Sequence, residues 1–316
     1  HQIFRENIKK KNYPAFAKYC ADVAEHFIGE GIPVKYISPV NEPFWVWNGG
    51  QEGCHYRPSS CRKVLRAFVK ELDGRKTLDS VRLSGCENGD IRWFNKSYSH
   101  AVLGDPLVRT RLGALDIHSY CLHMPIPFFN NRMSFLKRFA KWMSKNYPDV
   151  PVNMSEWTHM QGGRDKGMDS ALVTANVMYE DLSVLNVISW QHWIAVSEVN
   201  YCDGLIYINL DDKTFEMTKR YYVTGNFSKY VPAGSVRVDV ACDDSELRLL
   251  AFKYDDGCAV IVINSTKKEK ELSLPEQYSA VKSAVTDDNN DLREYDIADP
   301  GHIKITPRSV TTIILR

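Results

Sequence analysis

The sequence predicts a protein in two parts, a parallel α/β region followed by an all-β region. Up to about residue 230, short apolar runs alternate with segments of helical period, and such alternation is typical of parallel strands joined by right-handed crossovers. Beyond residue 236 the sequence changes to short alternating strands separated by turn residues, which indicates a β-sandwich. We therefore expect two domains, residues 1–230 and residues 231–316.

The expected α/β region contains five strands with helices between them. A helix over 14–29 comes first, because Phe16, Tyr19 and Val23 recur at helical spacing and Gly29 ends the pattern. Five apolar runs predict the strands 34–40, 81–86, 115–120, 152–156 and 187–193. The further expected helices are one capped by Ser59/Ser60 that runs to Leu72, one within 90–103, and two over 134–146 and 170–186.

The expected sandwich consists of alternating runs between residues 236 and 316. The predicted strands are 247–252, 259–264, 281–285, 302–306 and 310–315. The turns between them include Asp255-Asp256-Gly257 and the Asp/Asn run 287–290. Since the sheets of such a region pack a core on one face, we expect no catalytic group in it.

Composition excludes several classes of protein. Lys and Arg number 40 and Asp and Glu 39, a net charge of +1, whereas a dedicated nucleic-acid binder usually shows a basic excess. No apolar run approaches the roughly 20 residues that span a bilayer. The eight cysteines include no CxxC pair, which argues against structural zinc. Cys54 and Cys61 are close enough in sequence to bridge, but buried free thiols are the preferred interpretation.

Reactive and aromatic residues stand at the ends of all five predicted strands. These residues are Asn41-Glu42, Glu87-Asn88, His118-Ser119-Tyr120, Ser155-Glu156-Trp157 and Trp190-Gln191-His192-Trp193. Parallel strands bring their carboxyl ends to one face, which is where barrel proteins hold their active sites. Carboxylates among aromatic rings and amides point to a sugar site, because rings stack on apolar sugar faces and planar polar groups bind hydroxyls.

Two carboxyl groups suffice for glycoside hydrolysis, one as proton donor and one as nucleophile or base. Glu42 lies between Asn41 and Pro43 at a strand end, and Glu156 directly precedes Trp157, so these two are the catalytic candidates. A structural role for Glu42, as a helix cap or in a salt bridge, is the weaker alternative. For Glu87 the two readings stay open, a carboxylate that binds a substrate hydroxyl or one with a structural role.

The run 37–43, Ile-Ser-Pro-Val-Asn-Glu-Pro, together with Ser155-Glu156-Trp157 resembles glycoside hydrolase family 30. Further similar segments are His118-Ser119-Tyr120, Trp190-Gln191, the passage 227–236 and the closing run 307–312. The resemblance implies that the chain is the C-terminal part of a (β/α)8 barrel, strands four to eight, followed by a β-sandwich. It also implies that Glu42 is the acid/base on strand four and Glu156 the nucleophile on strand seven.

The same resemblance implies a retaining O-glycosyl hydrolase that cleaves β-linked glycans by double displacement, a chemistry that requires no metal or organic cofactor. Asn41 would bind the sugar 2-hydroxyl, and Tyr120 would orient Glu156. The other expected substrate-binding residues are Trp45, Trp47, His118, Trp157 and Trp190. The run Gln51-Glu52-Gly53-Cys54 is similar to the endo-β-1,6-galactanase-like branch, although members that act on β-1,6-glucan, xylan or glucosylceramide share the scaffold.

Three expectations concern the surroundings of the protein. Barrel strands one to three have no counterpart here, so we expect them from an upstream segment or another chain, because an open sheet leaves edges unpaired. The expected partner is a polysaccharide or oligosaccharide, with no nucleic acid and no membrane span, and the expected location is secreted or periplasmic. The alternative from another class is a carbohydrate-binding protein without catalysis.

Overall fold

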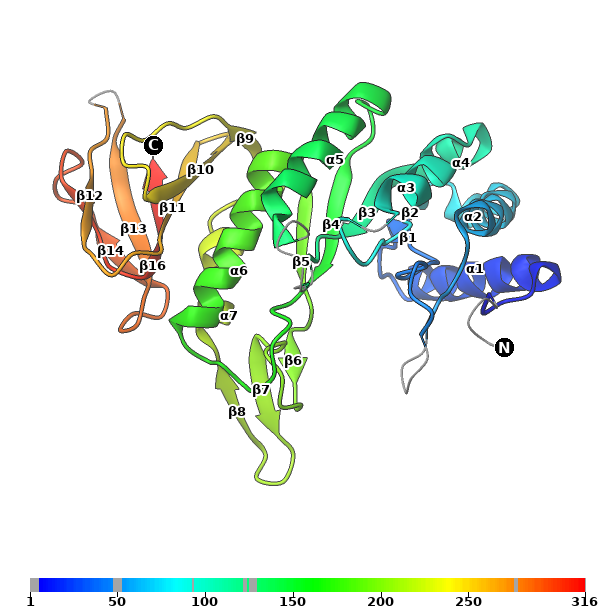
Figure 1. Ribbon diagram of the computed structural model, residues 1–316, viewed down its shortest axis with the longest axis horizontal. Coiled ribbons are helices and arrows are strands. Elements are labelled where there is room, and N and C mark those ends of the chain that lie inside the picture. The colour runs from blue at the N-terminus through cyan, green and yellow to red at the C-terminus, as the bar shows by residue number, and fades with distance from the viewer. Residues whose placement is uncertain are drawn as a thin grey trace. The chain divides into compact units, whose positions relative to one another are not determined.

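The computed structural model describes residues 6–47, 53–92, 94–121, 124, 130–275 and 278–315, and Figure 1 shows its elements. The chain divides into two compact units. The first unit comprises His1–Trp157 with Val184–Gln191, and the second comprises Thr158–Ser183 with His192–Arg316. The domain boundary predicted at residue 230 stays a prediction, and the two units are described separately.

A five-stranded sheet organises the first unit. Its strands are β1 (Tyr36–Ile37), β2 (Arg82–Ser84), β3 (Leu112–His118), β4 (Val152–Trp157) and β5 (Ser189–His192), and they lie side by side in chain order. The pairings of β1 with β2, β2 with β3 and β3 with β4 are parallel. This order is that of a half-barrel, so the predicted fold class is confirmed. The predicted strand 34–40 is wrong in extent, since only Tyr36 and Ile37 find partners on the short β2.

The helices of the first unit are α1 (Tyr13–Gly29), α2 (Pro58–Asp73), α3 (Asn95–Leu103), α4 (Pro106–Arg111) and α5 (Arg132–Asn146). Two short 3₁₀ turns, Lys10–Asn12 and Lys76–Leu78, accompany them. Ser59 and Ser60 do not cap α2 as predicted, because the helix begins earlier, at Pro58, with Arg57 in the N-cap position. Proline suits a first turn, where its missing N–H is not needed.

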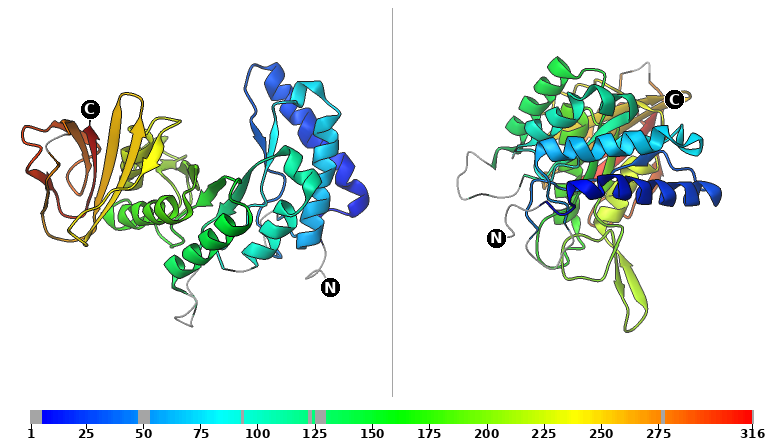
Figure 2. Two further views of the ribbon diagram at one scale, coloured as in Figure 1. Left: turned by 90° about the horizontal axis from the view of Figure 1, so that it is seen from above. Right: turned by 90° about the vertical axis from the view of Figure 1, so that its right-hand side faces the viewer.

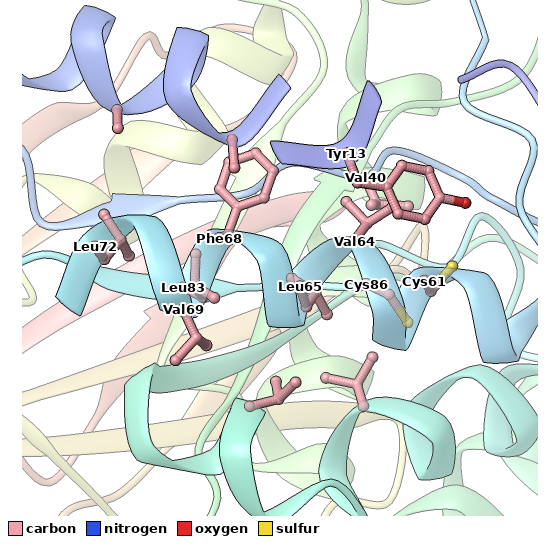
Figure 3. Packing of buried hydrophobic residues seen from close by; sticks show 14 of the residues in the cluster. Tyr13, Val40, Cys61, Val64, Leu65, Phe68, Val69, Leu72, Leu83 and Cys86 are labelled. Carbon is pink, nitrogen blue, oxygen red and sulfur yellow. The ribbon is translucent and has the colours of Figure 1, made fainter. Parts of the chain in front are cut away.

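Helices α1 and α2 pack against each other along their apolar faces, and they lie side by side in both views of Figure 2. Leu65, Phe68 and Leu72 of α2 are almost completely buried. Figure 3 shows Phe68 pointing from α2 toward α1, where its ring meets Phe16 edge-on at a centroid distance of 5.3 Å. The apolar residues of α2 recur at spacings of three and four, and this spacing places one apolar stripe against the core.

Phe68→Ala is expected to lower the free energy of unfolding by about 3–5 kcal/mol, because it removes a buried ring and leaves a cavity that the packed helices fill only in part. Urea denaturation followed by circular dichroism measures the change. Lys70→Ala, at an exposed position of the same helix, serves as the control and should change stability by less than about 0.5 kcal/mol. Equal effects of the two substitutions would contradict the packing described here.

The second unit contains one helix that the sequence predicted, together with a second helix and a small sheet that it did not predict. Helix α6 (Met168–Glu180) continues as one π-helical turn, Asp181–Leu185, and α7 (Lys219–Ser228) follows later. The prediction of one helix over 170–186 is therefore wrong at its end. The small sheet consists of β6 (Val196–Ser197), β7 (Ile206–Asn209) and β8 (Thr214–Met217). Every residue of β8 is exposed, so it lacks the buried alternation by which strands are recognised.

The all-β part of this unit has one large sheet and one small one. The large sheet runs β14 (Arg293–Asp296), β13 (Ala280–Thr286), β16 (Ser309–Leu315), β11 (Gly257–Asn264), β10 (Leu247–Tyr254) and β9 (Val236–Val238), and β12 (Lys270–Leu272) pairs with β15 (Ile303–Ile305). A core of apolar side chains, including Val262, Ile305 and Ile313, fills the region. The predicted all-β region is confirmed, with β9, β12 and β14 as strands that the sequence did not predict.

A buried amide joins α7 to the large sheet. Asn226 donates from Nδ2 to the carbonyl oxygen of Ala284 at 2.9 Å and accepts from the Thr286 hydroxyl at 2.7 Å. Because a buried amide must find partners for both of its ends, these bonds fix α7 on β13.

Two chemical properties of the chain follow from the structure. All eight cysteines are free thiols, Cys54 and Cys61 included. Within the described residues, none of the helices has the combination of length and apolarity needed to cross a bilayer.

Candidate active site

The backbone around Glu42 holds its carboxyl group at the end of β1. Glu42 donates its N–H to the carbonyl oxygen of Glu87 at 2.9 Å, and its own carbonyl accepts from the Trp47 indole at 3.2 Å. Glu42 and Glu87 both adopt left-handed backbone conformations, with φ of 45°. Such a conformation is unfavourable for a residue with a side chain and is concentrated at functional sites.

Gly89 leaves the space that the Glu42 carboxyl group occupies. A Cβ atom at this position would lie 2.6 Å from Cδ of Glu42 and 2.5 Å from Nε1 of Trp45. Both distances are shorter than non-bonded atoms tolerate. The backbone after β2 can therefore approach Glu42 closely only because residue 89 is glycine.

An irregularity in the sheet places Glu156 next to His118. The ladder between β3 and β4 pairs Ile117 with Met154 but His118 with Glu156, so Ser155 is an extra residue on β4. A bulge of this kind changes the direction in which the following side chains point. As a consequence the Glu156 carboxyl group lies beside the His118 imidazole, with 3.6 Å between Oε1 and Nδ1.

Three carboxyl groups surround the imidazole of His118, whose side chain is fully buried. Nδ1 lies 2.8 Å from Oε1 of Glu42, and Nε2 lies 3.0 Å from Oε2 of Glu87. The side chains of Glu42, Glu87 and Glu156 retain 11%, 16% and 18% of their exposure, so each still reaches the surface. The strands therefore bring the predicted residues Glu42, His118 and Glu156 together, and add Glu87 to them.

Burial and charge act in opposite directions on these groups. Burial lowers the pKa of His118, but its hydrogen bonds to Glu42 and Glu87 and the charge of Glu156 outweigh burial and raise that pKa to about 9. Burial raises the pKa of Glu156, against the opposing effect of the His118 charge. Burial also raises the pKa of Asp116, on β3, to about 6. The neighbouring carboxylates therefore favour the positively charged form of His118 at neutral pH.

Oxygen atoms of Glu42 and Glu156 and a nitrogen of His118 lie within 4.8 Å of one another. A metal ion could use such donors only if Nδ1 of His118 offered a lone pair. Both imidazole nitrogens face carboxylate oxygens, and an imidazolium has no lone pair to offer. The donor set therefore fits a counter-ion cluster, and we assign no metal to it.

Tyr120 lies beside Glu156, with its hydroxyl donating to Oε1 at 3.3 Å. The tyrosine is buried, and its ring meets the His118 ring edge-on at 6.1 Å. A donor to the ionised carboxylate favours that form, and the bond accordingly lowers the pKa of Glu156, in opposition to the larger effect of burial. The hydroxyl thus holds this carboxyl group in place and favours its ionised form.

The remaining predicted residues differ in accessibility. Asn41 is exposed, and Trp45 and Trp47 are half-buried. Trp157 is buried and packs against Trp190, with 6.1 Å between ring centroids and an angle of 46°. The predicted contacts of these residues and of His118 with substrate stay predictions. The Gln51-Glu52-Gly53-Cys54 run lies in part outside the described residues.

Sequence reasoning assigned no role to two serines that complete the cluster. Ser38, before Glu42, donates from its hydroxyl to Oε1 of Glu87, and Ser155 donates to Oε2 at 3.2 Å. The signal for Ser155 was its place immediately before Glu156 at a strand end. The signal for Ser38 was weaker, because an apolar run that ends in Ser-Pro reads simply as a strand terminus.

A half-barrel of parallel strands that gathers carboxylates at one edge, in a chain that also carries an all-β region, defines the class of barrel glycoside hydrolases. The family model described as "O-Glycosyl hydrolase family 30" matches residues 2–207. The chain belongs to this family, as its motifs predicted.

The known proteins that are similar to the chain are named for activities on different substrates. It is 25% identical to mouse lysosomal acid glucosylceramidase over 199 residues, which cover 57% of this chain and 36% of that protein. It is 24% identical to the endo-β-1,6-galactanase of Hypocrea rufa over 275 residues, which cover 80% of this chain and 50% of that protein. The chain thus spans half or less of the length of these relatives.

A solved structure supports the fold. The family 30 endoxylanase of Clostridium papyrosolvens C71 superimposes with a TM-score of 0.75 at 17% identity, covering 97% of this chain and 72% of that one. Nearly all of the chain therefore has a counterpart in a single known architecture.

Proposed function

We propose that the chain carries the catalytic pair of a retaining glycoside hydrolase that cleaves β-linked glycans by double displacement. The observation that carries this proposal is the approach of Glu42 and Glu156, which bring carboxylate oxygens within 4.8 Å of each other. Retaining enzymes hold their carboxyl groups about 5–5.5 Å apart, whereas inverting enzymes need about 6.5–9.5 Å to admit a water. So close an approach of two carboxylate oxygens supports the retaining arrangement over the inverting one.

In this proposal Glu156 is the nucleophile and Glu42 the acid/base. Glu156 must be ionised to attack the anomeric carbon, and it has the His118 charge and the Tyr120 hydroxyl beside it. Glu42 protonates the departing oxygen, and then takes a proton from the water that releases the glycosyl-enzyme intermediate. Asn41, which precedes Glu42, binds the 2-hydroxyl next to the reacting carbon.

We further propose a β-1,6-galactan-like substrate, with Trp45, Trp47, Trp157 and Trp190 as the aromatic surfaces for sugar rings. The Gln51-Glu52-Gly53-Cys54 run, similar to the endo-β-1,6-galactanase-like branch, supports this choice. The same fold acting on β-1,6-glucan, xylan or glucosylceramide is the alternative. Because polysaccharides are found outside cells, we expect the protein to be secreted or periplasmic.

Hydrolysis assays distinguish these substrates. Aryl β-galactosides, β-glucosides and β-xylosides, together with oligosaccharides of β-1,6-galactan and of xylan, are incubated with the full chain, and proton NMR identifies the first anomer released. We expect the β-anomer, in retention, with preference for the β-1,6-galactan series. Binding of oligosaccharides with no turnover of any activated glycoside would support the non-catalytic alternative.

We also propose that further strands complete the sheet beyond β1. Among the residues that the structure describes, strand β1 pairs with β2 alone, so its other edge presents unpaired backbone groups. On α1 the apolar side chains of Tyr19, Val23 and Phe27, four residues apart, remain exposed at 66%, 37% and 43%. Amide hydrogen exchange tests the state of this edge: fast exchange is expected for the chain alone at Tyr36, whose N–H faces away from β2, and protection there would contradict a free edge.

Tyr120→Phe removes the hydroxyl that donates to Glu156 but keeps the ring. We expect kcat/KM to fall about 10-fold, since a charge-assisted hydrogen bond contributes about 1.5–3 kcal/mol. Loss of this donor also raises the pKa of Glu156, so the acidic limb of the pH–rate profile should move to higher pH. Tyr19→Phe, at an exposed position of α1, is the matched control. An unmoved acidic limb would show that Tyr120 does not act on the nucleophile.

A further inference from the structure

Glu87 is a third carboxylate whose contacts are all directed into the protein. It follows β2, and its carbonyl oxygen accepts the backbone N–H of Glu42 at 2.9 Å. Its carboxyl group accepts from the hydroxyl of Ser38 on one oxygen, and from Nε2 of His118 and the hydroxyl of Ser155 on the other. Three donors already occupy this carboxylate and leave it little capacity to bind a substrate hydroxyl.

The two nitrogens of His118 face two different carboxylates, Nδ1 toward Glu42 and Nε2 toward Glu87. A neutral imidazole has one N–H, so it can donate to only one of these oxygens, whereas an imidazolium donates to both. In the described part of the chain, His118 is the cation that forms ion pairs with Glu42, Glu87 and Glu156. Both carboxylates therefore receive a hydrogen bond from the ring only if the ring is charged.

We propose that Glu87 is a positioning residue that acts through His118: its carboxylate keeps the ring an imidazolium, which directs Nδ1–H at Oε1 of Glu42. The other oxygen of Glu42, Oε2, is then the one that holds the transferable proton. This last consequence rests on the proposed role of Glu42 as the acid/base. Glu87 itself touches no reacting atom in this account.

The titratable groups around His118 lie on, or shortly after, the strands β1 to β4. Glu42 follows β1, Glu87 follows β2, Asp116 lies on β3, Tyr120 follows β3, and Glu156 lies on β4. Glu87 is the one of these whose carboxylate bonds Nε2, while Glu42 and Glu156 share the Nδ1 side. Removing the charge of Glu87 should therefore lower the pKa of the His118 imidazolium while leaving Glu42 and Glu156 in place.

Histidine NMR on the full chain tests the charge state directly, without any need for turnover. Spectra of protein with labelled histidine are recorded across pH, and His118 is assigned from the signal that disappears in His118→Asn. We expect the wild-type ring to stay doubly protonated through pH 7 and to lose its proton only near pH 9. A wild-type His118 that is neutral at pH 7 would overturn the proposal, whether or not any variant folds.

Glu87→Gln separates the charge of the carboxyl group from its shape. The amide oxygen can still accept a hydrogen bond from Nε2–H, so the shape of the site is preserved. Because the negative charge is lost, we expect His118 to lose its proton about 1–3 pH units lower than in wild type. Glu30→Gln, the same change at an exposed position after α1, should leave the titration unmoved. An unchanged titration in a folded Glu87→Gln protein would refute the role of Glu87.

Kinetics then connect the charge to the reaction. In Glu87→Gln, kcat should fall with rising pH as His118 becomes neutral, with KM nearly constant, whereas wild type keeps its activity over the same range. If the His118 titration shifts in Glu87→Gln but its pH–rate profile is identical to that of wild type, the proposed effect of His118 on Glu42 is wrong. If the ring titrates as expected and wild type hydrolyses no glycoside, the charged His118 stands and the proposed function fails, so the two failures are distinguishable.

Discussion

Glu156→Gln is expected to abolish turnover, with kcat reduced by about 10⁴-fold or more, on the scale seen when a covalent nucleophile is removed. The amide oxygen is too weak a nucleophile to form the glycosyl-enzyme intermediate. The substitution is nearly isosteric, and the Tyr120 hydroxyl can still donate to the amide oxygen. Folding should therefore persist, and initial rates on an aryl β-glycoside measure the loss.

Azide distinguishes the loss of a nucleophile from general damage to the site. In Glu156→Ala a small anion can occupy the vacated space and attack the sugar from the opposite side, which gives a glycosyl azide of inverted configuration. Glu30→Gln, exposed and outside the cluster, is the control for the glutamine variant and should keep full activity. Turnover of Glu156→Gln within tenfold of wild type would eliminate Glu156 as the nucleophile.

Glu42→Gln is expected to affect substrates unequally, because protonation matters most for a poor leaving group. Natural glycans should lose about 10²–10⁴-fold in kcat/KM, the range of a general acid/base. Glycosides with an activated aryl group leave without much protonation, so their first step should survive better. Release of the intermediate should then limit the rate, and a burst of the aryl product followed by slow turnover measures this.

The azide product also discriminates between the two carboxyl groups. In Glu42→Ala the intermediate still forms on Glu156, and azide, which needs no base, should release it with retained configuration. Glu156→Ala should give the inverted azide instead. A single configuration from both variants would mean that the two roles have been exchanged or misassigned.

The sequence predicted most of the sheet because its strands follow a simple rule. Continuous apolar runs with polar residues after them mark buried parallel strands, and β2, β3, β4 and β5 all lie within or overlap the predicted ranges. The failures have a common cause. Strand β1 is short because its partner β2 is short, and β6 to β8 bury too little to leave a pattern. Hydrogen-bond pairing with neighbouring strands determines where these elements begin and end, and this pairing cannot be predicted from their residue types.

The site was predictable as a set of residues but not as a geometry. That Glu42, His118 and Glu156 converge follows from their places at the ends of parallel strands. Their order around the imidazole depends on the extra residue Ser155 in the β4 ladder and on the close approach of Gly89 to Glu42. The inward orientation of Glu87 depends on the same local backbone, which is why the sequence left its role open.

Trapping the covalent intermediate tests the central claim most directly. An activated 2-deoxy-2-fluoro β-glycoside slows both steps but forms the intermediate with a good leaving group, so the full chain incubated with the galactosyl, glucosyl and xylosyl reagents should accumulate one glycosyl adduct. Peptide mapping by mass spectrometry then locates the sugar. The account predicts an ester on Glu156, absent in Glu156→Gln, whereas a sugar found on Glu42 or Glu87 would contradict it.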